Sequence, residues 1–175
     1  PTLRLIALLR NPRERTISAF NHYVRAGIIR RYFTKEIDMN AIISSKLASL
    51  SRGERSFEDF ELRLITSGIY IHGLDAWGRK WNASQFLVLR SENFFSDTNA
   101  VMLRVCSFLG LEPLAPRQAW PVRNPAPQGF RTKFRADHEL KMKLDAFFAP
   151  YNALLYEWLR ERAIDFEHWS NDTAL

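Results

Sequence analysis

The feature that most constrains this chain is an uninterrupted apolar run, Leu5–Leu9, that stops abruptly at Arg10, Asn11 and Pro12. A continuous run of this length is typical of a strand that is covered on both faces of a parallel sheet. Asn11 can cap a helix, and Pro12 suits the first helical turn because its missing N–H would have no partner there. The pattern therefore predicts a buried strand, a tight turn and a helix.

The predicted helix has two contrasting faces. Residues three or four positions apart share a helix face, and here one such set is basic and hydrogen-bonding while the other is apolar. The first set is Arg15, Ser18, His22 and Arg25, and the second is Ile17, Phe20, Val24 and Ile28. Free amides and the positive dipole end of such a helix attract anions at the carboxyl edge of a sheet. The basic face is either part of an anion site or an ordinary solvated surface.

Further along the chain, the strand and helix signals alternate. Residues 85–90 form a second continuous apolar run, and a helix capped by Asp97 and ended by Gly110 follows it. This order predicts an α/β fold with a parallel sheet flanked by helices and right-handed crossovers. At 175 residues the chain fits one domain, residues 1–175.

The remaining segments are helical or proline-rich. Residues 30–67 read as a helical insertion with one helix after Asp38 and another after Ser56. Residues 137–162 predict a long helix in which Pro150 makes a kink or separates two helices. Between them, residues 112–135 contain closely spaced prolines and predict a long loop, which in a compact domain is usually functional or disordered.

Aromatic residues recur at helical spacing within residues 68–81, namely Tyr70, Leu74, Trp77 and Trp81, and such a stripe predicts core packing. His72 lies off this stripe, and no second histidine or cysteine stands at ligand spacing, so no metal site is expected. Cys106 has no intrachain partner and sits in an apolar helical pattern, which predicts a core thiol.

Composition favours anionic partners. The formal charge is +6 and the pI is about 9.8, and 19 of the 25 lysines and arginines are arginines, which bind phosphate, sulfate and carboxylate in a bidentate manner. Nucleotides, acidic glycans and nucleic acids all remain open on this basis. No apolar run approaches the roughly 20 residues that span a bilayer, so no membrane segment is expected.

Several motifs resemble those of the sulfotransferases that use 3′-phosphoadenosine 5′-phosphosulfate (PAPS). Arg10-Asn11-Pro12, followed by Glu14-Arg15 and then Ser18, is similar to their 3′-phosphate-binding segment. Later matches fall in the family's order and look like Golgi-type carbohydrate sulfotransferases, nearest to the subgroup that sulfates chondroitin-type glycans. These matches are residues 68–77, the run 85–90 with Glu92, residues 105–111, and residues 147–155, which fit "FF-x-P-[YF]-N-x-x-L".

The resemblance implies a P-loop-NTPase-like fold in which Arg10 and Ser18 bind the 3′-phosphate of PAPS. Gly129 and Arg131 would belong to a second phosphate loop, although the family's Lys-Gly-Arg here reads Gln128-Gly129-Phe130-Arg131. The implied product is 3′,5′-adenosine bisphosphate, no metal is required, and the acceptor is a carbohydrate whose binding residues are not assigned. Within the insertion, the loop at residues 49–55 with Arg52 and Arg55 is either part of an acceptor site or a surface excursion with solvated charges. The implied location is the Golgi lumen or secretory pathway in a eukaryote, and otherwise the cytoplasm.

One part of the family pattern is missing. The sequence contains no Gly-x-x-x-x-Gly-Lys-[Ser/Thr] loop and no Gly-Lys pair. By resemblance, the loop that holds the 5′-phosphosulfate and the catalytic base would lie upstream of residue 1, so this chain is expected to be a piece of a longer domain. No catalytic residue is assigned, and the upstream half of the same domain is an expected partner.

Two other functions compete with this interpretation. A non-catalytic module that binds acidic glycan or nucleic acid through arginines would also be basic, but the sequence contains no recognised nucleic-acid motif. A P-loop nucleotide kinase would share the fold but requires the Walker lysine that the sequence lacks.

Overall fold

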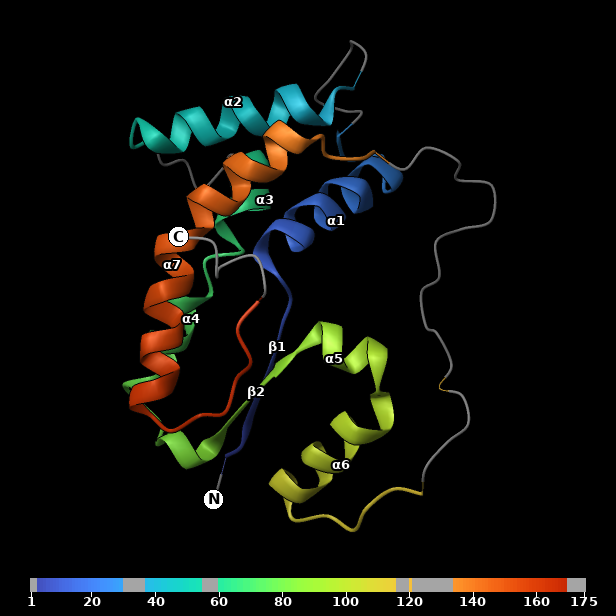
Figure 1. The fold of residues 1–175 in the computed structure, drawn as a ribbon, viewed down its shortest axis with the longest axis vertical. Coiled ribbons are helices and arrows are strands. Elements are labelled where there is room, and N and C mark those ends of the chain that lie inside the picture. The colour runs from blue at the N-terminus through green and yellow to red at the C-terminus, as the bar shows by residue number, and fades with distance from the viewer. Residues whose placement is uncertain (1–2, 30–36, 55–59, 116–119, 121–133, 170–175) are drawn as a thin grey trace.

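The structure is a computed structural model that describes residues 3–29, 37–54, 60–115, 120 and 134–169 (Figure 1). Within these residues the elements in chain order are β1 (Leu5–Leu9), α1 (Pro12–Arg25), α2 (Met39–Ser51), α3 (Phe60–Thr66), α4 (Tyr70–Gly78), η2 (Ala83–Gln85), β2 (Phe86–Arg90), α5 (Ser91–Ser96), α6 (Thr98–Leu109) and α7 (His138–Glu161).

The two strands form a parallel sheet, as predicted. Leu5 lies opposite Phe86, and the register continues to Leu9 opposite Arg90, so both strands end at the same edge. Helices α4 and α7 lie on one side of this sheet, and α5 and α6 lie on the other (Figure 1). The α/β class with a parallel sheet and flanking helices is confirmed.

Coverage of the strands differs between β1 and β2. In β2, Val88 and Leu89 point to opposite faces and are both buried, so the prediction of a strand covered on both faces is confirmed there. In β1 that prediction is wrong, because Ile6 is 44% and Leu8 is 49% exposed while Leu9 is buried. The described residues pack against only one face of β1, and the other face of this strand is apolar and open.

The core has two parts. The first joins α1, α2, α3 and α7, and its fully buried residues include Phe20, Ile43, Leu64, Leu144 and Phe148. The second joins the sheet to α4, α7 and the segment after α7, and includes Leu9, Val88, Leu155, Trp158 and Trp169. Burial of Phe20 and Val24 confirms the predicted apolar face of the first helix.

Helix boundaries follow local chemistry where the sequence supplies it. Asp38 caps α2 by accepting from the amides of Asn40 and Ala41, and Asp97 caps α6 by accepting from Ala100. Gly110 ends α6 with a φ of 68°, a left-handed conformation that glycine adopts without strain. All three predicted boundaries are confirmed, whereas the predicted start after Ser56 lies outside the described residues.

The last helix and the aromatic stripe each differ in part from their sequence predictions. The last helix runs unbroken from His138 to Glu161 through Pro150, so the alternative of two separate helices is wrong; the helix axis changes direction near its middle in Figure 1. Trp77 is 48% exposed and stacks on Trp81 with ring centroids 4.8 Å apart, so it is not a core residue. The stripe fails there because α7 packs along the side of α4 that carries Ile71 and Leu74.

Cys106 is buried with a free thiol, as predicted. Across the described part of the chain, no cluster of histidine, cysteine or acidic residues has the arrangement of a metal site. None of the helices in that part is both long and apolar enough to cross a membrane.

Candidate phosphate-binding site

The turn between β1 and α1 is fixed by hydrogen bonds to both sides of one peptide group. The carbonyl oxygen of Arg10 accepts from the Tyr70 hydroxyl at 2.8 Å. The amide of Asn11, which belongs to the same peptide, donates to Glu92 Oε1 at 2.8 Å. Tyr70 begins α4 and Glu92 lies just after β2, so two distant parts of the chain set the plane of the Arg10–Asn11 peptide.

Tyr70 is suited to this role at neutral pH. Burial raises the pKa of its hydroxyl to about 12, so the group stays protonated and can donate to the Arg10 carbonyl. The Arg15 and Arg10 guanidinium groups oppose this shift less strongly than burial favours it.

The start of α1 is less open to anions than the sequence predicts. The Asn11 side chain accepts from the Glu14 amide at 3.3 Å, and Pro12 has no N–H. The Glu92 carboxylate also places negative charge against the Asn11 amide. This helix end therefore offers fewer free amides than the sequence predicts, which increases the weight of nearby side chains in any anion site here.

Arg10 and Ser18, the two predicted phosphate ligands in this region, have side chains that remain available. Arg10 follows the last residue of β1 and Ser18 lies in α1, about 9 Å along the axis from Pro12 at 1.5 Å per residue. Both are partly exposed, and neither side chain has a hydrogen bond or ion pair with another described residue. They are thus positioned to bind a ligand without first giving up an internal contact.

The neighbouring arginines are committed to the fold instead. Arg13 contacts Asp145 on α7 at 2.6 Å, and Arg15 Nη1 donates to the Leu64 carbonyl at 2.6 Å. These bonds attach α1 to α7 and α3. Arg15 therefore belongs to the packing of the domain, although the sequence places it on the same stripe as Ser18.

Gly129 and Arg131 lie outside the described residues, but the residue where the loop 112–135 rejoins the domain is described. Asn21 of α1 accepts from the Phe134 amide at 2.8 Å and donates to the Phe134 carbonyl at 3.1 Å. Asn21 is three residues beyond Ser18, which is about one helical turn. The end of the proline-rich loop is therefore fixed close to the predicted phosphate-binding serine.

A cavity of about 340 Å³ lies between α2, α3, α4 and α7. Its lining combines apolar and aromatic surface with a few polar groups, and includes Arg63, Ile69, His72, Phe147 and Tyr151. The rings of His72 and Tyr151 meet edge to face, with centroids 6.0 Å apart. The Arg63 side chain has no hydrogen bond or ion pair with another described residue. Ile69 lines the cavity and the next residue, Tyr70, donates to the Arg10 carbonyl, so both regions include a residue at the start of α4.

Sequence reasoning missed three residues of this site. It placed Tyr70 in the core, noted Glu92 only as part of a motif, and did not consider Trp169. Trp169 Nε1 donates to Glu92 Oε2 at 3.3 Å, and its ring lies 6.2 Å from that of Tyr70. No local pattern marks these contacts, because the residues that meet are 60 or more positions apart.

The turn after β1 lies at the carboxyl end of the parallel strands, the edge at which open α/β sheets usually bind ligands, and Arg10 and Ser18 are available there. The sulfotransferase domain model matches residues 1–119. The chain belongs to the sulfotransferase domain family.

Individual relatives agree with this assignment. Human carbohydrate sulfotransferase 15 is 27% identical over 93% of this chain and 31% of its own length. The bifunctional heparan sulfate N-deacetylase/N-sulfotransferase 1 of Caenorhabditis briggsae is 22% identical over 99% of this chain and 22% of its own length. The chain therefore spans less than a third of these two relatives.

The fold is also similar to a solved structure, a sulfotransferase from Alicyclobacillus acidocaldarius. The TM-score is 0.61 with 21% sequence identity, and the match covers 93% of this chain and 56% of the other. This confirms the predicted fold class.

Proposed function

We propose that this chain supplies the 3′-phosphate-binding half of an enzyme that transfers a sulfuryl group from PAPS to a hydroxyl of a carbohydrate. Family membership supports the reaction, and the names of the two curated relatives support a glycan acceptor. The observation that carries the proposal is a pair of uncommitted side chains: Arg10, on a peptide held by hydrogen bonds on both sides, and Ser18, in the helix that follows.

Arg10 would bind the 3′-phosphate by a charge-assisted hydrogen bond, and Ser18 would donate its hydroxyl. Gly129 and Arg131 would contact the same phosphate from the other side. The bonds between Asn21 and Phe134 support this, because Arg131 is three residues from Phe134 and an extended chain covers at most about 10 Å in three residues.

In the transfer, the acceptor oxygen forms a bond to sulfur while the bond from sulfur to the phosphate oxygen of PAPS breaks, and the acceptor proton passes to a base. The residues that stabilise the departing oxygen and accept this proton would come from the rest of the enzyme. The absence of any Gly-Lys pair in the sequence supports this division, as does the open apolar face of β1 at Ile6 and Leu8. A further part of the same domain would cover that face.

The acceptor glycan would enter the cavity between α2 and α7. Its aromatic side chains Phe147 and Tyr151 offer surfaces for the apolar face of a sugar ring, and Arg63 can bind a carboxylate or sulfate. Hydrogen bonds from the Ser49 hydroxyl and then from Arg52 lower the pKa of Glu54, which lies at the edge of the cavity. Arg52 pairs with the Glu54 carboxylate at 2.8 Å and so partly neutralises its negative charge. A carbohydrate acceptor is also consistent with a location in the Golgi or secretory pathway.

The test is nucleotide binding by the full-length protein, measured by calorimetry. We expect 3′,5′-adenosine bisphosphate to bind more tightly than adenosine 5′-phosphate, and Arg10→Ala or Ser18→Ala to weaken only the bisphosphate. Loss of one charged phosphate contact should cost about 1.5–3 kcal/mol, roughly ten- to a hundredfold in Kd.

Two variants serve as matched controls. Arg79→Gln changes an exposed arginine at the C-terminal end of α4, and Ser45→Ala changes an exposed serine of α2. Unchanged bisphosphate binding in both Arg10→Ala and Ser18→Ala would overturn the proposal. Steeply salt-dependent binding of glycan with no preference for the bisphosphate would instead support the non-catalytic anion-binding module.

A further inference from the structure

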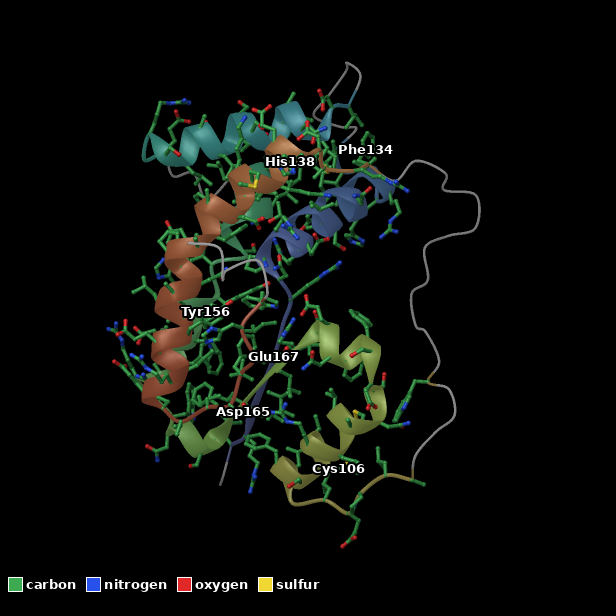
Figure 2. The ribbon with its side chains drawn as sticks, in the orientation of Figure 1. Cys106, Phe134, His138, Tyr156, Asp165 and Glu167 are labelled. Carbon is green, nitrogen blue, oxygen red and sulfur yellow. The ribbon has the colours of Figure 1, made fainter. Side chains whose placement is uncertain are left out.

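The segment after α7 returns to the carboxyl end of the sheet, where Trp169 contacts the two residues, Glu92 and Tyr70, that hold the Arg10–Asn11 peptide. In Figure 2 it passes from the end of α7 through the labelled Asp165 and Glu167 towards the centre of the molecule. Arg90 at the end of β2 holds it there, with Nη1 3.0 Å from Glu167 Oε1 and 3.2 Å from the His168 carbonyl. This segment, residues 163–169, lies outside the range that the family model matches.

Trp169 ends the described part of this segment and is almost completely buried, with 1% of its surface exposed. Its amide donates to the Tyr156 hydroxyl at 3.1 Å, and the Phe166 ring meets its ring edge to face at 5.2 Å. The position of this indole is therefore set by α7 and by the segment to which Trp169 belongs.

The indole contacts both groups that hold the Arg10–Asn11 peptide. Its Nε1 donates to Glu92 Oε2 at 3.3 Å, while the other oxygen of that carboxylate accepts from the Asn11 amide. Its ring packs at 6.2 Å from the ring of Tyr70, whose hydroxyl donates to the Arg10 carbonyl. One buried side chain thus restrains the hydrogen-bond partners on both sides of the same peptide.

We infer that Trp169 is a positioning residue for the 3′-phosphate site, acting through Glu92 and Tyr70 on the peptide from which Arg10 projects. The inference rests on the proposed function. A carboxylate that lost the indole N–H could rotate towards Arg90, whose Nε is 3.9 Å from Glu92 Oε2, and the Asn11 amide would lose its partner. The Arg10 side chain would then project from the turn in more than one orientation. Because only one orientation binds the phosphate, the apparent affinity would fall.

The variant that tests this is Trp169→Phe, which keeps an aromatic ring but removes the N–H donor. The matched control is Trp158→Phe, because Trp158 is also buried and also donates its indole N–H to a carboxylate, Asp75, at 3.3 Å. Among the described residues, Trp158 makes no hydrogen bond or ring contact with Glu92 or with residues 10–12. Tyr70→Phe provides a second variant that removes the bond on the other side of the peptide.

In the full-length protein we expect Trp169→Phe to weaken 3′,5′-adenosine bisphosphate roughly tenfold, the effect of about one hydrogen bond to a charged group. Trp158→Phe should leave this affinity unchanged. Both tryptophan variants should lower the unfolding temperature, and to a similar extent. In an Arg10→Ala background, Trp169→Phe should have no further effect on affinity, since it acts through Arg10. Equal weakening by both tryptophan variants, or full additivity with Arg10→Ala, would overturn the inference.

Amide hydrogen exchange of the peptide that contains Asn11 provides a readout without nucleotide. Trp169→Phe should accelerate exchange at Asn11 and Trp158→Phe should not; equal exchange in the two variants would contradict the positioning role. If the wild-type protein bound no bisphosphate but exchange at Asn11 still responded to Trp169→Phe, the proposed function would fail while the structural link from Trp169 to the turn held.

Discussion

The Arg10–Asn11 turn and the cavity between α2 and α7 are built in opposite ways. At the turn, hydrogen bonds from Tyr70 and Glu92 fix the backbone and leave the Arg10 side chain uncommitted. In the cavity, helical side chains form an aromatic and apolar wall with a few polar groups at its edge. A fixed backbone suits a small rigid anion, whereas side-chain walls suit a larger ligand held by many weak contacts. Under the proposed function, the turn would bind the donor nucleotide and the cavity would bind the acceptor.

The largest effect should come from breaking the turn itself with Glu92→Ala. This change leaves the Asn11 amide and the Trp169 indole N–H without their acceptor, and we expect a loss of about 2–3 kcal/mol in the free energy of unfolding. Chemical denaturation monitored by tryptophan fluorescence measures it. Wild-type stability in this variant would show that the carboxylate does not hold the turn.

A second prediction concerns the other bond to the same peptide and uses pH. Burial raises the folded-state pKa of Tyr70 to about 12 from an ordinary value of 10. The contribution of the Tyr70 hydroxyl to the free energy of unfolding is therefore complete below pH 10 and is lost as pH rises from about 10 to 12. A shift of two pKa units corresponds to about 2.7 kcal/mol. The difference in unfolding free energy between wild type and Tyr70→Phe should be constant from pH 7 to 9 and shrink above 10. A constant difference up to pH 12 would contradict the buried, neutral hydroxyl.

A third prediction breaks the cavity and leaves the turn intact. Arg63→Gln should raise the acceptor KM about fivefold, close to 1 kcal/mol, and leave the KM for PAPS unchanged. Steady-state kinetics with a glycan acceptor measures both constants, and Lys143→Gln on an exposed part of α7 is the matched control. A parallel rise in the PAPS KM would show that the cavity and the turn are not separate sites.

The smallest effect should appear outside both regions. Arg79 pairs with Asp75 at 2.7 Å, but its side chain is 77% exposed, and such surface pairs contribute little. Arg79→Ala should change the unfolding free energy by less than about 0.5 kcal/mol and neither KM. A larger change would mean that the end of α4 contributes to one of the two sites.

Local chemistry in the sequence predicted the elements that position the turn. The apolar runs predicted both strands, and the side chains of Asn11, Asp38 and Asp97 predicted where helices begin. Burial could not be predicted in the same way. Leu5–Leu9 reads as covered on both faces, yet the coverage of Ile6 and Leu8 depends on what packs against β1, which its own sequence does not encode.

The contacts that fix the site could not be predicted because they join distant residues. Glu92 meets Asn11 across 81 positions and Trp169 across 77, and neither separation follows any helical or strand period. Likewise, Arg15 and Ser18 look equivalent on one helix face, but only the fold shows that Arg15 is bonded to the Leu64 carbonyl. The roles of Gly129 and Arg131 remain predictions that rest on the resemblance and on the bonds at Phe134.

The most direct test of the central claim is a double comparison of Arg10→Ala with removal of the ligand's 3′-phosphate. Calorimetry on the full-length protein would give four values of Kd, for wild type and Arg10→Ala with 3′,5′-adenosine bisphosphate and with adenosine 5′-phosphate. If Arg10 binds the 3′-phosphate, the variant should lose roughly ten- to a hundredfold in affinity for the bisphosphate and almost nothing for the monophosphate. Equal losses for the two nucleotides would contradict the assignment of this turn as the 3′-phosphate site.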